Sequence, residues 1–264
     1  MTGMRALLVA VLLICGTGPV AAQSLSLGGT ATVNGIVDGD TVLLDVKIDG
    51  SNEVRLVGIQ APKLPLGRKG FKKWPLADEA KQKLEALVLG RNVTLKFGGR
   101  RMDRHGRLLA HLFDQSGAWV QGAMLRAGMA RVYSFPDNRS VVADMLDLEQ
   151  AARSGHLGIW DNSYYQLQDA QNLEGLIGTF QLIEGVVFDA VTVRGTTYLN
   201  YTEDWRNDFT VSLNKRTRGL FLQAGLDPIT LKSKRIRVRG WLKKRNGPMI
   251  EATHPEQIEI LGDK

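Results

Sequence analysis

Residues 37–63 of the chain read V-D-G-D-T-V-L-L-D-V-K-I-D-G-S-N-E-V-R-L-V-G-I-Q-A-P-K. Two apolar runs, rich in β-branched residues, stand on either side of Asp49-Gly50-Ser51-Asn52, residue types that favour a turn. This pattern predicts a strand, a turn and a second strand. Two carboxylates, Asp38 and Asp40, stand on either side of Gly39, where the backbone can bend freely.

Three sequence blocks that include this stretch resemble the staphylococcal nuclease (thermonuclease) family. They are D-G-D-T at 38–41, R-L-V-G-I-Q-A-P at 55–62 and D-R-H-G-R at 103–107. They occur in the family's order and at similar spacing, and the resemblance covers about residues 35–160. It implies a mainly β fold with α-helices, namely a five-stranded Greek-key barrel of the oligonucleotide-binding type with three helices.

The resemblance also implies a phosphodiester site in which a calcium ion and two arginines surround the scissile phosphate. A hard cation and guanidinium groups stabilise the negative charge that develops on phosphoryl oxygens. By motif, Arg55 and Arg107 match the two phosphate-contacting arginines, and Asp40 matches one calcium-binding aspartate. From residue type alone, both arginines are as well suited to a solvated position or to pairing with Asp40 as to phosphate contact.

Two positions depart from the family's pattern. Gln60 stands where the family has a calcium-binding aspartate, and Lys63 stands where it has the general-base glutamate. Relative to the family, glutamine in place of aspartate raises the formal charge of the site by +1, and lysine in place of glutamate raises it by +2, a total of +3. We therefore predict a degenerate calcium and general-base site, with Lys63 as a surface lysine or a phosphate contact. Three other carboxylates are candidates for the missing base, and the spacing selects none of them: Glu53, Asp78 and Glu79.

The N-terminal segment has the pattern of a signal peptide. A short positive region is followed by a Leu/Val-rich run and by Val20-Ala21-Ala22, which fits a cleavage site before Gln23. The apolar run is too short to span a membrane. We expect residues 1–22 to be removed and the protein to be periplasmic or secreted. The only cysteine, Cys15, would be lost with them, which excludes disulfides and thiolate metal sites from the mature chain.

The rest of the first half predicts one domain over residues 33–162, after a flexible Ser/Gly-rich lead-in at 23–32. Hydrophobic periodicity predicts helices at 76–89, 120–128 and 141–153. Strands are predicted within 33–59 and at 93–97 and 108–113.

A polar linker at 163–177 is predicted to precede a second domain at 178–262. Short apolar runs predict strands at 180–188, 190–194, 197–200, 208–213, 235–242 and 258–261, with one helix at 218–224. Stretches such as Tyr198-Leu199-Asn200-Tyr201 resemble small nucleic-acid-binding barrels of the oligonucleotide-binding type. We expect a second barrel of that kind.

The second half of the chain is the more basic, because residues 176–264 hold 14 basic and 10 acidic side chains. Eight of its basic residues fall in 232–245, a stretch with no acid. Arg235, Arg237 and Arg239 alternate with apolar residues, so that a strand places the three guanidinium groups on one face. This face is either solvated or a stripe that tracks nucleic-acid phosphates, with Tyr198, Tyr201 or Trp205 as stacking platforms.

The leading interpretation is therefore an exported protein that binds nucleic acid, of unspecified type, through a degenerate nuclease site. One alternative is an active phosphodiesterase with an altered metal or base arrangement. Another is an envelope module whose barrels bind protein.

Overall fold

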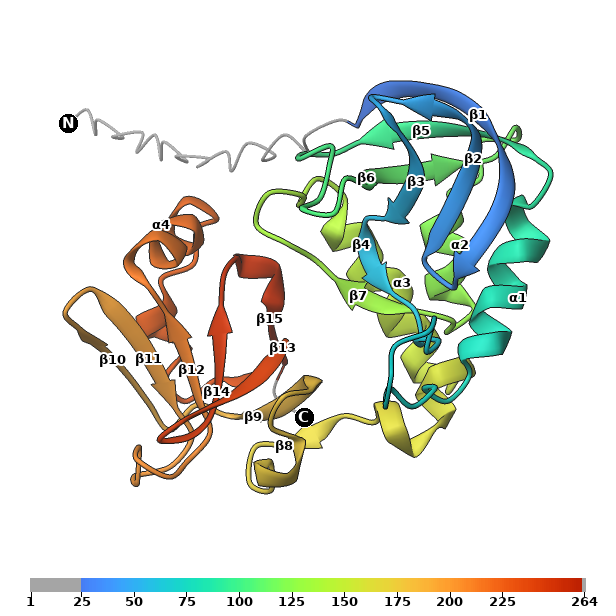
Figure 1. Cartoon of the computed structure of the whole chain (residues 1–264). Helices are drawn as coiled ribbons and strands as arrows, with labels where there is room; N and C mark the ends of the chain where they lie inside the picture. The colour runs from blue at the N-terminus through green and yellow to red at the C-terminus, as the bar shows by residue number, and fades with distance from the viewer. Residues whose placement is uncertain (1–24, 263–264) are drawn as a thin grey trace, which may run out of the picture.

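A computed structural model describes residues 25–262, so the predicted signal peptide and Cys15 lie outside the described residues. The chain forms two lobes, a barrel with its helices and a second, curved sheet (Figure 1). None of the helices in the described range is long and apolar enough to cross a membrane.

Five strands form a closed barrel in the order β1-β2-β3-β6-β5. Neighbouring strands are antiparallel except β3 and β6, which are parallel. This arrangement confirms the predicted fold class. The strands are β1 (Ser26–Asp38), β2 (Thr41–Ile48), β3 (Ser51–Leu56), β5 (Asn92–Phe97) and β6 (Leu108–Phe113).

The segment expected to be a flexible lead-in is instead the first half of β1. Residues 26–32 pair antiparallel with β5. The prediction was wrong because it considered only the local Ser/Gly content. Pairing along β5 satisfies the backbone groups of this segment and closes the barrel.

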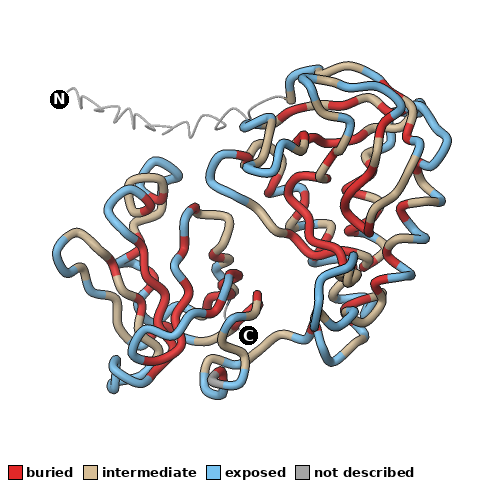
Figure 2. The backbone as a smooth tube through the Cα atoms, viewed as in Figure 1, coloured by how far each residue is buried: buried red, intermediate tan, exposed pale blue. Residues whose placement is uncertain are grey.

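Three helices pack beside the barrel: α1 (Ala77–Val88), α2 (Val120–Arg126) and α3 (Val142–Ser154). Each lies within two residues of its predicted bounds. Ala80, Leu84 and Val88 form one buried face of α1, which shares the barrel core. A short antiparallel pair, β4 (Gly58–Gln60) and β7 (Arg131–Tyr133), lies between the barrel and the second lobe. Figure 2 shows a separate buried interior in each lobe.

The second lobe is an eight-stranded sheet in the order β10-β11-β12-β14-β13-β9-β8, with β15 paired to β13. Like β3 and β6, β12 and β14 are parallel, and α4 (Lys215–Gln223) follows β12. β10 lies at one end of the strand order and β9 lies near the other end, yet only residues 187 and 188 join them. The sheet therefore curves into a half-barrel. Its strands are β8 (Gln168–Asp169), β9 (Phe180–Val186), β10 (Asp189–Val193), β11 (Thr196–Asn200), β12 (Thr210–Leu213), β13 (Arg235–Arg245), β14 (Gly247–Ala252) and β15 (Ile258–Ile260).

The two lobes are packed against each other rather than joined only by the predicted linker. A hydrophobic cluster contains Ile159 and Trp160 from the first lobe and Phe180 and Leu182 from the second. Part of the linker belongs to the second sheet, because β8 pairs with β9. Short 3-10 turns complete the chain at Gly158–Asp161, Ser163–Tyr165, Glu174–Leu176, Pro228–Leu231 and Pro255–Gln257.

Two buried histidines make the stability of this fold sensitive to pH. His111 lies in β6, and His254 lies at the interface, 2.7 Å from the Ser134 hydroxyl. Burial lowers the pKa of each to about 4, whereas an unfolded histidine titrates near pH 6.5. The unfolded chain therefore binds more protons, and stability should fall as the pH drops from about 6.5 to about 4. The expected loss is up to about 3 kcal/mol per histidine.

Urea unfolding at about pH 7.5 and about pH 5 measures this loss. His254→Gln should reduce the difference in unfolding free energy between the two pH values. The same change at exposed His105 should leave the difference as it is. An identical pH dependence in the wild type and His254→Gln would contradict the assignment.

Candidate functional site

The turn between β1 and β2 holds two carboxylates at the centre of the site. A side chain at Gly39 would place its Cβ 2.7 Å from that of Ala61 and 2.9 Å from that of Ala80, so only glycine fits there. Asp38 and Asp40, on either side of this glycine, are both buried. The Ala61 backbone N–H donates to Asp40 Oδ2 at 2.8 Å and fixes the Asp40 carboxylate.

Lys63 reaches into this carboxylate pair. Its Nζ lies 2.7 Å and 2.6 Å from the two carboxylate oxygens of Asp40, and 3.2 Å from Asp38 Oδ2. Three of the four carboxylate oxygens therefore accept from one ammonium group. The Lys63 side chain is thus an internal counterion of the two aspartates and is only 18% exposed.

The charges around the two aspartates act differently on each. Burial alone would raise the pKa of Asp40, but Arg55 and Lys63 outweigh burial and hold that pKa well below its usual range. For Asp38, burial and the neighbouring Asp40 carboxylate raise the pKa despite Lys63. The site therefore holds Asp40 as a carboxylate with two cationic partners.

Arg55 is directed inward from β3. Its Nη2 lies 3.2 Å from Asp40 Oδ2, and the guanidinium also donates to the backbone carbonyls of Asp40, Leu56 and Ile59 at 3.2, 2.7 and 2.6 Å. Arg55 is therefore paired with Asp40 in this structure. These bonds fix the guanidinium of a residue that lines a cleft of about 470 Å³.

Arg107 lies in the same cleft because β3 and β6 are parallel neighbours. Its Nε and Nη2 lie 2.8 and 2.7 Å from Asp103 Oδ2. Partial burial alone would raise the pKa of Asp103, but hydrogen bonds from Arg107 and His105 lower it. The wall of this cleft also includes Arg100, Arg104, Tyr133 and Phe135. The structure therefore unites the two predicted arginines in one basic, aromatic-lined cleft.

Gln60 does not face the carboxylate pair. Its Oε1 accepts from Nε and Nη2 of Arg131 at 3.0 and 2.7 Å, across the β4–β7 pair. Arg131 also donates to the backbone carbonyl of Phe180 in the second lobe at 3.2 Å. Burial lowers the pKa of Arg131 to about 10. Gln60 thus belongs to the contact between the lobes.

The residues present do not fit a calcium ion. Calcium takes six to eight oxygen ligands, yet both oxygens of Asp40 are within hydrogen-bonding distance of the Lys63 ammonium. The Gln60 amide oxygen is bound to Arg131. In the described part of the chain, no group of three or more His, Cys, Asp and Glu side chains is arranged to hold a metal.

The three arginines of the predicted phosphate-tracking stripe are paired with acids instead of forming an open basic face. Arg235, Arg237 and Arg239 do share one face of β13, but the first lobe and nearby acids cover that face. Arg237 and Arg239 are buried. The stripe forms ion pairs of 2.5 to 3.0 Å with Glu149, Glu184 and Glu259. The acids come from other strands and from α3, so the acid-free local sequence concealed them.

The prediction also missed the aromatic wall of the cleft. Tyr133 and Phe135 pack edge to face at 4.9 Å, and Phe135 is exposed. Trp241 of the second lobe donates its indole N–H to the Tyr133 hydroxyl at 2.9 Å. The sequence signal is two aromatic residues two positions apart, which an extended segment places on the same side.

The other candidate bases lie away from the carboxylate pair or are already paired. Asp78 is exposed and pairs with Lys73 at 2.5 Å. Glu53 lies 4.0 Å from Arg107, which holds it at the cleft rather than beside Asp40. Glu79 is exposed at the start of α1.

Sequence comparison with known proteins gives a family match and several relatives. The sequence model of the family described as Staphylococcal nuclease homologue matches residues 53–162. "SPbeta prophage-derived endonuclease YokF" and "Endonuclease YncB", both of Bacillus subtilis (strain 168), are 32% and 31% identical. Each alignment spans 51% of this chain, but only 45% and 63% of the respective relative. "Protein ParB" of Escherichia coli is 33% identical over 49% of this chain and 71% of its own length.

Proposed function

Because the chain belongs to the staphylococcal nuclease homologue family, we propose that it binds nucleic-acid phosphodiesters in the cleft of Arg55 and Arg107 without calcium. The observation that carries this proposal is the position of the Lys63 ammonium, within 2.7 Å of both Asp40 oxygens. In the proposed state, the protein has kept the family's phosphate-binding arginines and replaced its metal chemistry with an internal ion pair.

The chemistry available at such a site is binding rather than hydrolysis. A charged ammonium neutralises the carboxylates but has no open position for a water or a phosphoryl oxygen, and it cannot accept a proton. The general base that the family has at this position contributes on the order of 10²- to 10⁴-fold in rate. With neither the base nor the ion, the arginines still attract phosphate.

The cleft has two features that favour nucleic-acid binding, namely positive charge for the phosphates and an aromatic ring for a base. Arg100 and Arg104 are exposed and add positive charge beside Arg107, which suits phosphate. The exposed ring of Phe135 offers a surface on which a base can stack. Asp103 and Asp137 offset part of the charge, since they pair with Arg107 and Arg100.

Replacement of cleft arginines tests this proposal. Arg107→Gln and Arg104→Gln should each weaken binding of a labelled DNA duplex in the presence of chelator. The logarithmic salt slope should flatten by about 0.9 for each phosphate interaction that a substitution removes. Fluorescence anisotropy between about 50 and about 200 mM salt measures both quantities.

Arg126→Gln is the matched control, because it removes the same charge from the exposed end of α2. The proposal fails if both cleft variants bind with the affinity and salt slope of the control. Arg104→Gln tests phosphate binding without disturbing the Asp103–Arg107 ion pair, since the Arg104 side chain holds no ion pair with Asp103.

The second candidate function is an active phosphodiesterase, and the relatives named endonucleases favour it. It requires another carboxylate in place of the two that the family has at positions 60 and 63, which are Gln60 and Lys63 here. Asp103, Asp137 and Glu53 lie beside Arg107 and Arg100 of the cleft. Cleavage of the same duplex by the unmodified chain, abolished in Arg107→Gln, would support this candidate and exclude the first.

A further inference from the structure

A second cavity lies on the outer face of the second sheet, outside the residues that match the family. It has a volume of about 530 Å³ and is formed by β10, β11, β12 and β14 with the loop before β12 and the β13–β14 turn. Successive side chains of a strand point to opposite faces. Leu199, Val211 and Ile250 fill the core, while their neighbours line this cavity.

Aromatic and aliphatic groups form its walls. Trp205 is 48% exposed, and Tyr198 lies on the same face. Val191, Val193 and Met249 provide an apolar floor. An open surface of this composition suits a flat, partly apolar ligand.

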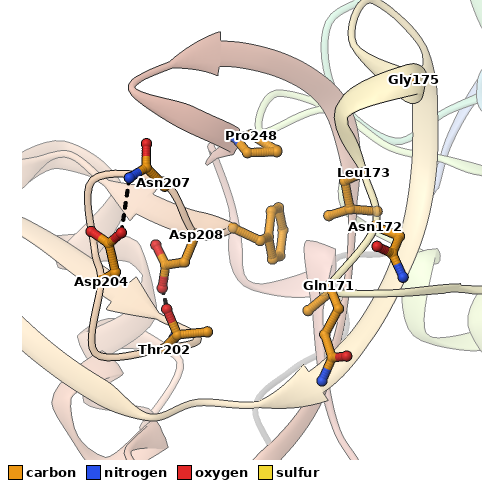
Figure 3. A pocket seen from close by; sticks show the side chains of 11 residues that line it. Gln171, Asn172, Leu173, Gly175, Thr202, Asp204, Asn207, Asp208 and Pro248 are labelled. Atoms are coloured by element: carbon orange, nitrogen blue, oxygen red, sulfur yellow. Dashed lines mark hydrogen bonds between the residues drawn. The ribbon is translucent and has the colours of Figure 1, made fainter.

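The loop that carries Trp205 is held on both sides by carboxylates. The Asp208 carboxylate accepts from the backbone N–H groups of Tyr201 and Thr202 at 2.7 Å each. Asp204 accepts from the side-chain amide of Asn207 at 2.8 Å, as Figure 3 shows. Asp204 and Asp208 thus accept hydrogen bonds within the loop, and Trp205 is presented on a fixed support.

Two arginines lie at the cavity. The Arg206 guanidinium lies 4.2 Å from the Trp205 ring centroid. Arg245 lines the cavity and is 67% exposed, with its guanidinium 4.0 Å from Glu251. The one carboxylate in the lining, Asp189, is paired with Lys232 at 2.8 Å. The charge therefore favours an anionic ligand over a basic one.

We propose that this cavity binds an unpaired base of single-stranded nucleic acid. The base stacks on Trp205 and Tyr198, its edge meets the amides of Asn200 and Asn246, and the flanking phosphates meet Arg206 and Arg245. Base pairs in a duplex are already stacked, so only a single strand can enter in this way. This inference rests on the proposed function and adds a second contact on the same strand.

Photo-crosslinking distinguishes the two sites. An oligonucleotide that contains 5-bromodeoxyuridine is irradiated with the full mature chain, and tryptic peptides are identified by mass spectrometry. Cleavage after the flanking arginines releases residues 195–206, with Tyr198 and Trp205, and residues 132–139, with Tyr133 and Phe135. We expect crosslinks in both peptides.

Affinity for oligothymidylate gives the quantitative test. Trp205→Ala and Tyr198→Ala should each weaken it by about 5- to 160-fold, the range that loss of one stacked base implies. Leu222→Ala is the matched control, because Leu222 is 47% exposed on α4 and does not line the cavity. Arg245→Gln should weaken binding and flatten its salt dependence.

Crosslinks confined to residues 132–139, with Trp205→Ala binding like the control, would overturn this inference and leave the proposed function standing. Crosslinks in neither peptide, together with no effect of Arg107→Gln, would overturn the proposed function as well. Binding of a peptide but not of oligothymidylate at Trp205 would assign the cavity to a protein partner and also overturn the inference.

Discussion

Replacing Lys63 with glutamate should make the Asp38–Asp40 pair respond to calcium. The change removes the ammonium that contacts three carboxylate oxygens and adds a third carboxylate beside them. Loss of one partner of a buried ion pair costs about 3–5 kcal/mol, so the variant should melt well below the wild type in chelator. Calcium should restore stability, by about 2.7 kcal/mol at a hundredfold excess over its Kd.

Thermal unfolding in chelator and in calcium measures this response. Lys63→Met serves as the control, since it removes the ammonium without adding an oxygen ligand. It should be destabilised to a similar degree and should ignore calcium. A Lys63→Glu protein as stable as the wild type in chelator, and unchanged by calcium, would contradict the role assigned to Lys63.

Adding Gln60→Asp to this variant should contribute little. The family resemblance suggests that aspartate at position 60 restores a calcium ligand. In the structure, position 60 lies against the Arg131 guanidinium. A carboxylate there should pair with Arg131 instead of a metal.

The second large effect is expected from Glu149→Gln. Glu149 is fully buried in α3 and accepts from Arg239 at 2.8 and 3.0 Å, from Arg153 at 3.1 Å and from the Val132 N–H at 2.6 Å. The neutral amide leaves part of the Arg239 charge buried without its counterion. A loss of about 3–5 kcal/mol in unfolding free energy should follow.

Urea unfolding of Glu149→Gln and Glu251→Gln compares the same chemical change in two surroundings. Glu251 pairs with Lys243 on the surface, where such pairs contribute about 0–1 kcal/mol. Equal destabilisation of the two variants would mean that the buried network does not hold the lobes together. Because Arg239 belongs to the second lobe, Glu149→Gln should also loosen the Trp241–Tyr133 contact at the cleft.

Local sequence patterns predicted the elements of the first lobe well where apolar spacing was regular. The helix at Ala77–Val88 follows directly from the spacing of Ala80, Leu84 and Val88. The patterns failed where distant pairing decides the structure. The first half of β1 is ordered by β5. β14 begins at Gly247-Pro248, residue types that locally indicate a turn, and pairs in parallel with β12 about 40 positions earlier.

The same distinction applies to the site. The motif blocks identified Asp40, Arg55, Lys63 and Arg107, and strand pairing brings them to one region. The motifs did not show that Lys63 folds back onto Asp38 and Asp40, or that Gln60 meets Arg131, which is 71 positions away. Arg239 is separated from Glu149 by 90 positions, so its burial is invisible in the basic run itself. Contacts across such separations depend on the packing of whole elements.

A calcium titration of the unmodified protein by isothermal calorimetry, with Lys63→Glu measured alongside, tests most directly whether Lys63 takes the place of the metal. The Lys63 ammonium at Asp40 predicts no saturable heat for the wild type and one calcium site in the variant. One-to-one calcium binding by the wild type, abolished by Asp40→Asn, would contradict the claim that Lys63 has taken the place of the metal.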